Sequence, residues 1–374
     1  MQPFSSPWSD APTYLAATRP DQPVLFFHPS RLTETARRFQ RGFPGLVTYA
    51  VKANPAPEVL RTLCLAGMRA FDVASPAEMA AVRQACPDAV LHYNNPVRSR
   101  AEVAQAIGYG VTSWSVDDPG ELAKLAGITK GSEVSVRLRL PVSGAAYHFG
   151  EKFGADPDHA AALLQQMVQM GFRPSMTFHP GTQCADPAAW VSYIDACSQV
   201  AAKAGVSLHR LNVGGGFAAH RTGTAPNPER VFEAIGQAVT RAFGPNAPAL
   251  VCEPGRAMVA EAYSLAARVK SVRSDGRVYL NDGIYGAMSE WRDIGMMDRL
   301  TVLRADGCLR TGPTRPGIVF GPTCDSIDRL PAPLDLPIAL TEGDYLLFDG
   351  MGAYSLAIGT RFNGYGEFGK VSLR

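Results

Sequence analysis

The sequence has no long apolar run, no cluster of basic residues and no strong excess of charge. No apolar stretch reaches the roughly 18 residues that a membrane-spanning helix needs. Lysine and arginine total 36 and aspartate and glutamate total 34, so the formal net charge is only +2. A surface for nucleic acid is therefore not indicated. We expect neither a membrane nor a nucleic acid as a partner.

Cysteine and histidine are also scarce and scattered. The seven cysteines are odd in number and show no Cys-x-x-Cys spacing, which is typical of a reduced cytoplasmic protein with mostly buried thiols. The seven histidines include no His-x-x-x-His pair, so no metal site is expected. Residues 1–10 are polar and rich in Pro and Ser, without a basic start or apolar segment, which argues against a secretory signal. These features predict a cytoplasmic protein.

Alternating apolar strands and helical patterns fill the first two thirds of the chain. The 374 residues, 46% of them hydrophobic, suggest two domains. Strands separated by helices indicate parallel βαβ units, and eight of them favour a closed (β/α)8 TIM-like barrel over a doubly wound open sheet. The expected barrel strands are residues 46–50, 70–73, 90–94, 112–116, 134–140, 175–179, 210–213 and 249–252.

The pattern changes after about residue 258, where helical periodicity fades. Short β-rich runs separated by Gly and Pro turns predict an all-β domain. The expected strands there are residues 262–269, 277–280, 300–304, 317–320 and 345–348. The predicted organisation is a lead-in over residues 1–28 whose strand pairs with the β domain, a barrel over 29–257 and a C-terminal β domain over 258–374.

One lysine directly follows the first apolar strand. Lys52 lies in the hexapeptide Tyr-Ala-Val-Lys-Ala-Asn at residues 49–54. A lysine in this place suits an amine that forms a Schiff base with a carbonyl compound. A strand-end lysine that reaches solvent is the simpler alternative. The residues placed around Lys52 decide between the two.

Active sites of (β/α)8 barrels form at the carboxyl ends of the strands. A carboxylate, an imidazole, arginines and a triglycine loop stand at those ends together with the lysine. This set is what a phosphorylated aromatic aldehyde, pyridoxal phosphate, requires. The residues are Asp72, Arg137, His179, Gly214, Gly215, Gly216, Glu253 and Arg256.

Each of these residues also has a simpler explanation. The three glycines could form a flexible turn, although their N–H groups suit an anion. His179 could be a satisfied strand-end histidine, and Glu253 could pair with Arg256. Ser75 and Glu78 form a capping-box pattern, so Glu78 could serve only to cap a helix. The joint placement of the candidates at the strand ends favours a site.

The ordered motifs resemble the fold-type III pyridoxal-phosphate decarboxylases, which include ornithine, lysine and diaminopimelate decarboxylases. The resemblance covers nearly the whole chain and implies an alanine-racemase-like barrel with a C-terminal β domain. Gly-Pro-Thr-Cys-Asp and Phe-Asn-Gly-Tyr (362–365) resemble the ornithine/lysine branch most. The motifs lie at residues 49–54, 71–75, 179–183, 214–217, 253–256, 281–286, 321–325 and 352–354.

The resemblance implies roles for the barrel residues. Lys52 would bond to the cofactor aldehyde, and Glu253 would keep the pyridine nitrogen protonated, so that the ring withdraws electrons. Asp72 and Arg137 would support the lysine and the ring edge, and His179 would stack on the ring face. The phosphate would be held by Thr182, Gly214, Gly215, Gly216, Arg256 and Tyr354.

The resemblance also implies a homodimer with shared active sites. Cys324 and Asp325 would reach the site from the partner subunit. Cys324 would return a proton to the carbon that loses CO2, and Asp325 would accept the distal ammonium of the substrate. A small buried apolar role is the alternative for Cys324.

One stretch departs from the family pattern. Ornithine-type members carry a Tyr-Asp pair after the Asn-Asp-Gly motif, and that Asp binds the distal amine. Without a gap, Ile294 falls on the Asp position and Asp293 on the Tyr position. A shift of one residue would restore Asp293, whereas without it Arg292 would place a positive charge nearby.

The predicted function is pyridoxal-phosphate-dependent decarboxylation of a basic or diamino acid, of the kind used in polyamine biosynthesis. Three alternatives stay open: a decarboxylase of another modified amino acid, an amino-acid racemase of the same fold type and a non-catalytic cofactor carrier. A racemase would need a catalytic Tyr in the β domain, and known carriers are single barrels.

Overall fold

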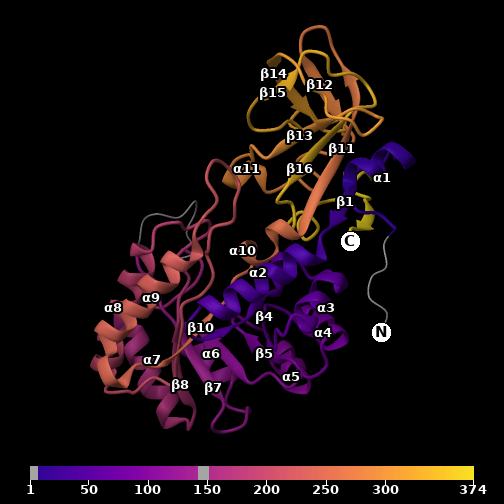
Figure 1. Ribbon diagram of the computed structural model, residues 1–374. Coiled ribbons are helices and arrows are strands. Elements are labelled where there is room, and N and C mark those ends of the chain that lie inside the picture. The colour runs from indigo at the N-terminus through magenta and orange to yellow at the C-terminus, as the bar shows by residue number, and fades with distance from the viewer. Residues whose placement is uncertain (1–6, 142–150) are drawn as a thin grey trace. The chain divides into compact units, whose positions relative to one another are not determined.

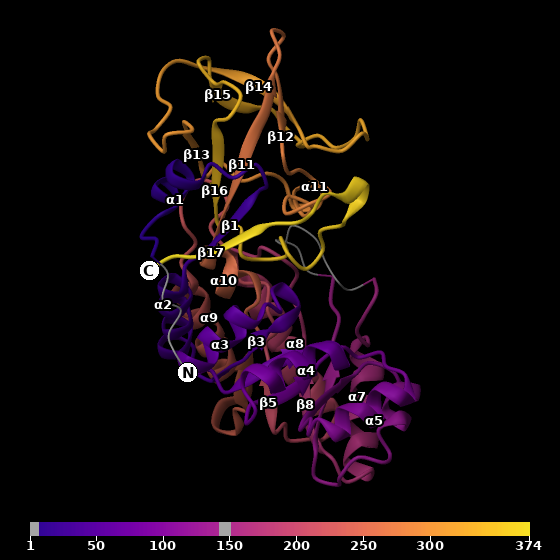
Figure 2. The ribbon, with the colours of Figure 1, turned by 90° about the vertical axis from the view of Figure 1, so that its right-hand side faces the viewer.

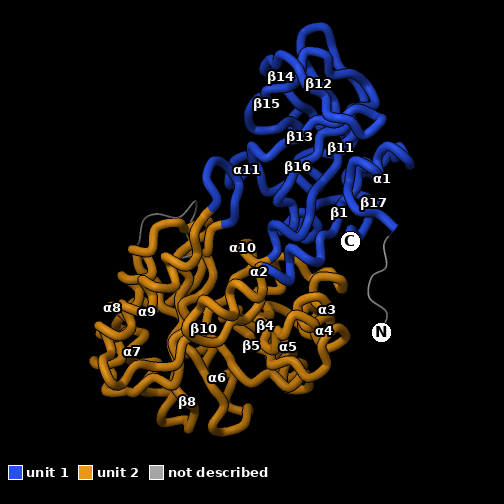
Figure 3. The backbone as a smooth tube through the Cα atoms, viewed as in Figure 1, with its two compact units in different colours: residues 1–34, 219–225, 259–374 blue, residues 35–218, 226–258 orange. Residues whose placement is uncertain are grey.

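The computed structural model describes residues 7–141 and 151–374 (Figure 1). The chain divides into two compact units, which Figure 3 colours separately. The barrel unit comprises residues 35–218 and 226–258, and the β unit comprises residues 1–34, 219–225 and 259–374. Among the helices of the described residues, none has the length and apolar character needed to span a membrane.

The barrel unit is built on a parallel sheet that closes on itself. β2 pairs with β10 and β3 pairs with β4, and Thr48 alone separates β2 from β3. The Thr48 N–H donates to the Cys252 carbonyl over 2.9 Å across this closure. The predicted eight-pass barrel is therefore confirmed. Its strands are β2 (Leu46–Val47), β3 (Tyr49–Ala50), β4 (Ala70–Val73), β5 (Val90–Tyr93), β6 (Ser113–Val116), β7 (Glu133–Arg137), β8 (Arg173–Thr177), β9 (Arg210–Asn212) and β10 (Ala249–Cys252).

Helices connect successive strands, and their starts follow from local chemistry. Ser99 and Glu102 form a complete capping box at α5. At α4, Ser75 accepts from the Glu78 N–H, whereas the Glu78 carboxylate accepts from the Ala74 N–H. The helices are α2 (Pro29–Gly42), α3 (Pro57–Leu65), α4 (Pro76–Ala85), α5 (Arg100–Gly108), α6 (Pro119–Lys124), α7 (Pro157–Gln169), α8 (Ala188–Ala204) and α9 (Pro228–Phe243).

The β unit is a mixed sheet that includes strands from both ends of the chain. β1 pairs antiparallel with β11 on one side and parallel with β17 on the other, as Figure 2 shows. Its strands are β1 (Val24–Phe27), β11 (Tyr263–Val272), β12 (Arg277–Leu280), β13 (Leu300–Leu303), β14 (Thr314–Phe320), β15 (Leu334–Pro337), β16 (Tyr345–Asp349) and β17 (Gly369–Ser372).

Some described elements of the β unit have no counterpart in the sequence prediction, among them α1 (Ala11–Thr18), β15, β17 and α11 (Trp291–Ile294). α1 begins inside the Pro-rich lead-in, because the Asp10 side chain accepts from the Thr13 N–H and Pro12 stands in the first turn. β15 and β17 are short segments whose strand form depends on pairing with β14 and β1. Two further helices of four residues are α10 (Arg256–Val259) and α11 (Trp291–Ile294).

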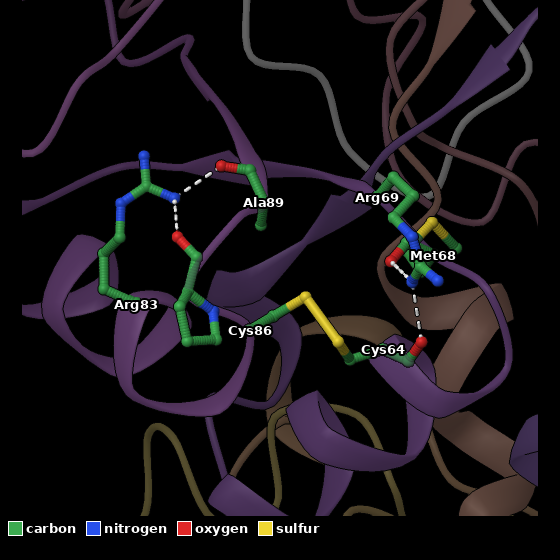
Figure 4. The surroundings of a disulfide bond; sticks show 7 residues. Cys64, Met68, Arg69, Arg83, Cys86 and Ala89 are labelled. Atoms are coloured by element: carbon green, nitrogen blue, oxygen red, sulfur yellow. Dashed lines mark hydrogen bonds between the residues drawn. A yellow bond between two sulfur atoms is a disulfide. The ribbon is translucent and has the colours of Figure 1, made fainter.

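A disulfide between Cys64 and Cys86 corrects the expectation of reduced thiols at these two positions (Figure 4). Cys64 lies in the last turn of α3, and Cys86 is the residue at which α4 ends. Their separation of 22 residues carries no pairing signal in the sequence, because pairing depends on the two helix ends lying side by side. The free cysteines are Cys184, Cys197 and Cys252, which are buried, and Cys308 and Cys324, which are exposed.

Candidate active site

A cavity of about 220 Å³ opens at the carboxyl ends of the barrel strands. Lys52 reaches it from the 3₁₀ turn Val51–Ala53 that follows β3, and Asp72 reaches it from β4. Arg137 ends β7, and Glu253 directly follows β10. The lining residues are Lys52, Asp72, Ala74, Asn94, Asn95, Arg137, Lys152, Phe153, Thr177, Phe178, His179 and Glu253.

The structure thus brings together five of the residues predicted from the sequence, all within the barrel unit. They are Lys52, Asp72, Arg137, His179 and Glu253. Other predicted residues belong to the same unit but do not line the cavity in the described part of the chain; these are Thr182, Gly214, Gly215, Gly216 and Arg256. The remaining candidates lie in the β unit and are Asp293, Ile294, Cys324, Asp325 and Tyr354.

Glu253 is held by two asparagine side chains. Asn94 Nδ2 donates to Glu253 Oε1 over 2.5 Å, and Asn212 Nδ2 donates to the same oxygen. All three residues are more than nine-tenths buried. A buried carboxylate requires such donors, because burial without partners disfavours its charged form.

Two carboxylates share this buried space. Burial, followed by the charge of Glu253, raises the pKa of Asp72 well above its ordinary value, while Lys52 opposes the rise. Burial also raises the pKa of Glu253, which the Asn212 hydrogen bond, Lys52 and Arg137 oppose. The cations and amides around the pair therefore determine which carboxylate is charged.

The surroundings of His179 favour the neutral form of its imidazole. Burial, together with the charges of Lys52 and Arg137, lowers its pKa well below the ordinary value. Its Nδ1 accepts a hydrogen bond of 3.1 Å from the Gly181 N–H. A neutral ring fixed in this way can stack on a flat aromatic group without adding a positive charge.

The triglycine loop packs against neighbouring backbone, so a side chain has no room there. A Cβ on Gly214 would lie 2.1 Å from the Phe178 carbonyl oxygen, and one on Gly216 would lie 2.4 Å from that of Gly181. Both residues also have positive φ angles, 68° and 85°. Close packing explains these two glycines, and the same turn leaves a concave backbone that suits an anion.

Arg137 and two unpredicted residues form one wall of the cavity. The Arg137 guanidinium lies 5.1 Å from the centre of the Phe153 ring, and the Lys152 amine lies at the same distance from that ring. Burial lowers the pKa of Arg137, while Glu253 raises it. Because Lys152 lines the cavity, the cavity contains a second lysine besides Lys52.

These residues fit pyridoxal phosphate. The cavity offers a lysine amine, a buried carboxylate and a neutral imidazole. Asp72 Oδ1 is buried and has no hydrogen-bond partner among the described residues, so an acceptor is available to a bound group. The concave triglycine backbone suits a phosphate.

In the β unit, the loop that carries Cys324 is held by a hydrogen bond from its own backbone. The Cys324 N–H donates to Asn363 Oδ1 over 3.1 Å. Asn363 adopts a left-handed conformation with a φ of 53°, which Asn tolerates better than most residues. The Cys324 side chain is exposed.

Asp325 is held as a carboxylate by two donors. The Tyr285 hydroxyl donates to Oδ2 over 2.6 Å, and the Ile327 N–H donates to Oδ1 over 3.0 Å. These bonds, that of Tyr285 first, lower the pKa of Asp325. Asp293 is exposed and Ile294 is half-buried at the end of α11.

The fold and the cavity define a barrel enzyme of the pyridoxal-phosphate class. Residues 30–260 match the family described as "Pyridoxal-dependent decarboxylase, pyridoxal binding domain". The chain belongs to this family.

Relatives of known name agree with this placement. A lysine/ornithine decarboxylase of Selenomonas ruminantium is 32% identical over 93% of this chain and 89% of that protein. A chloroplastic ornithine decarboxylase of Nicotiana glauca is 33% identical over 85% of this chain and 75% of that protein. The crystal structure of lysine/ornithine decarboxylase from Vibrio vulnificus with cadaverine is 28% identical, covers 94% of each chain and has a TM-score of 0.81. The predicted family, cofactor and enzyme class are confirmed.

Sequence reasoning missed Asn94, Asn212, Lys152, Phe153 and Tyr285. Asn212 gave a signal, because a lone amide stands between Leu211 and Val213 at the end of a predicted strand. Asn94 was placed at the end of a strand but was given no role. Lys152 and Phe153 follow residues that lie outside the described part of the chain, and Tyr285 was only one letter of a motif.

Proposed function

We propose that the chain removes the α-carboxylate of a basic amino acid such as lysine or ornithine, yielding the diamine and CO2. The observation that carries the proposal is the cavity in which Lys52, Glu253 and His179 converge at the mouth of a barrel. The likeness to lysine/ornithine decarboxylases over most of both chains supports the choice of substrate.

Residues of the barrel unit would hold pyridoxal phosphate by its reactive end and its ring. When bound, the cofactor supplies an electron-withdrawing ring that stabilises the negative charge left by CO2. The Lys52 amine would bond to its aldehyde, and the Glu253 carboxylate would accept a hydrogen bond from the protonated ring nitrogen. His179 would stack on the ring, while Asp72 and Arg137 would orient Lys52 and the ring edge.

The phosphate would be held mainly by backbone. The turn at Gly214–Gly216 presents N–H groups, and Thr182 adds a hydroxyl donor. Arg256 begins α10 and adds a positive charge, and Tyr354 adds a hydroxyl group.

Residues of the β unit would complete the site of a partner subunit in a homodimer. The Cys324 thiol would give its proton to the carbon that has lost CO2. Asp325 would accept a hydrogen bond from the distal ammonium, and its own two hydrogen bonds favour the ionised form that this needs. Either Asp293 or Ile294 would lie beside that ammonium.

A cytoplasmic location is part of the proposal. The free Cys197 and Cys252 thiols are compatible with a reducing compartment, whereas the Cys64–Cys86 disulfide is more typical of an oxidising one.

The test is a substrate panel with the holoenzyme. L- and D-ornithine, lysine, arginine, diaminopimelate and carboxyspermidine-type compounds are assayed for CO2 release and for change of configuration. We expect CO2 and a diamine from lysine or ornithine, and none from Lys52→Ala. Racemisation without CO2, or no reaction with any basic amino acid, would overturn the proposal.

A further inference from the structure

The Glu253 carboxylate receives both of its asparagine bonds on one oxygen. Asn94 follows β5 and Asn212 ends β9, so the donors come from separate strands of the barrel. No hydrogen bond to Oε2 occurs among the described residues. The arrangement is therefore asymmetric, with one oxygen satisfied by the protein and the other available to a ligand.

The orientation of the Asn212 amide is fixed by its other end. Asn212 Oδ1 accepts from the Gly214 N–H over 3.0 Å, so its Nδ2 must point toward Glu253. The Glu253 N–H in turn donates to the Gly214 carbonyl over 2.9 Å. The Asn212 side chain thus connects the first glycine of the triglycine turn with the Glu253 carboxylate.

Two amide donors on one buried oxygen favour the charged form of a carboxylate. They act against burial and against the neighbouring carboxyl of Asp72, both of which favour the neutral form. The other oxygen remains oriented by the fixed carboxylate plane. A charged acceptor in a fixed orientation is what a protonated ring nitrogen needs.

We propose that Asn94 and Asn212 are positioning residues for the decarboxylation, which hold Glu253 ionised with Oε2 directed at the ring nitrogen of pyridoxal phosphate. The inference rests on the proposed function in placing Glu253 at that nitrogen. Both asparagines act through Glu253, to which each donates its side-chain hydrogen bond.

A purely structural role makes a different prediction. Buried amides that only satisfy the barrel interior would affect the free energy of unfolding when removed, and would leave the protonation of the cofactor unchanged. Ser175 provides a matched control of that kind. It donates a buried hydrogen bond of 2.8 Å to Glu133 on the neighbouring strand and does not contact Glu253.

The experiment compares Asn94→Ala, Asn212→Ala and Ser175→Ala as holoenzymes loaded with ¹⁵N-labelled pyridoxal phosphate. The ¹⁵N chemical shift of the ring reports whether its nitrogen carries the proton. Loss of a donor raises the pKa of Glu253, so the ring proton moves to that carboxylate. Removing a bond to a charged group predicts that the acid limb of kcat moves upward by about one pH unit or more.

In both asparagine variants we expect the ¹⁵N shift of a deprotonated ring nitrogen and an acid limb of kcat that has moved upward. Wild type and Ser175→Ala should show neither change. Asn94→Leu, which fills the space without a donor, should behave as Asn94→Ala if the variant folds. Folded asparagine variants with a protonated ring and an unshifted limb would overturn the inference. The NMR signal does not depend on substrate, so it tests the inference even if lysine and ornithine are not decarboxylated.

Discussion

The Tyr285 hydroxyl donates a hydrogen bond of 2.6 Å to Asp325 Oδ2. Tyr285 is itself packed against Phe362, with ring centroids 5.1 Å apart. The Ile327 N–H satisfies the other oxygen, and both bonds favour the ionised form of Asp325. The carboxylate that would receive the distal ammonium is therefore oriented before any substrate arrives.

Tyr285→Phe should weaken substrate binding more than chemistry. The pKa of Asp325 then rises toward its ordinary value. When the pH is lowered, Asp325 therefore becomes protonated at a higher pH than in wild type, and binding of a cationic substrate is lost at that higher pH. We expect KM for lysine or ornithine to rise roughly two- to fivefold, the size of an exposed charged pair, with kcat little changed. The control is Tyr109→Phe, because the hydrogen bonds of Tyr109 among the described residues are made by its backbone atoms. A fall in kcat as large as the rise in KM would contradict this role of Tyr285.

Lys52 and Lys152 both line the cavity, so the cofactor has two amines to choose from. We expect borohydride reduction of the holoenzyme to fix the cofactor to the peptide that contains Lys52, because only Lys52 follows a barrel strand directly. Lys152→Ala should still be labelled, and Lys52→Ala should not. Peptide mass spectrometry reads the result, and a label on Lys152 would reverse the assignment.

The barrel was predictable because short runs that contain apolar residues alternate with helical patterns, and several of the helices begin at a capping side chain. The Ser75 and Ser99 caps are examples in which local chemistry and fold agree. β15 and β17 were missed, since their conformation comes from pairing with distant strands. The disulfide was missed for the same reason, because it depends on two helix ends meeting in space.

The candidate active site also has some residues that the sequence predicts and others that it does not. Lys52, His179 and Glu253 could be found because strand ends converge in a barrel and their residue types suit one cofactor. The bonds from Asn94 and Asn212 to Glu253 could not be found, because spacing along the chain does not show which side chains meet inside the barrel. The register at residues 293–294 depends on whether the chain carries a one-residue shift here relative to the family pattern.

That register is open to a direct test. If Ile294 has replaced the amine-binding carboxylate, Ile294→Asp should improve kcat/KM for ornithine or lysine, because a second negative charge would attract the ammonium. If Asp293 occupies that place instead, Asp293→Ala should impair the same constants. Steady-state kinetics on both variants decides between the two alignments. If neither substitution changes kcat/KM, this loop takes no part in substrate recognition.

His28 predicts part of the pH dependence of stability. Burial lowers its pKa to about 4 from the ordinary 6.5, and the ring is hydrogen-bonded to Ser264 Oγ at 3.0 Å. A lowered folded-state pKa contributes stability that is present above pH 6.5 and is lost as the pH falls toward 4. The loss amounts to about 3 kcal/mol over that window.

His28→Gln should therefore lose less stability between pH 6.5 and pH 4 than wild type does. Chemical denaturation at several pH values measures the difference in the free energy of unfolding. His220→Gln, which removes a half-buried imidazole of the same unit that bonds to the Gly223 carbonyl, is the control and should follow wild type. An unchanged slope in His28→Gln would show that the histidine is not the titrating group.

A shared active site makes a quantitative prediction about mixed dimers. Lys52 lies in the barrel unit and Cys324 in the β unit, and in the proposed dimer each site combines Lys52 of one protomer with Cys324 of its partner. In a two-fold dimer each surface is used twice, so two such sites form. Lys52→Ala and Cys324→Ala homodimers should then both be nearly inactive.

Mixing the two inactive variants should restore activity once subunits exchange. Half of the dimers become mixed, and in each mixed dimer one site receives both substitutions while the other receives neither. Activity should therefore return to roughly a quarter of the wild-type value by symmetry. Native mass spectrometry establishes that exchange has occurred. If mixed dimers form and no activity returns, Lys52 and Cys324 act within one chain, because only then does every site in a mixed dimer carry one substitution.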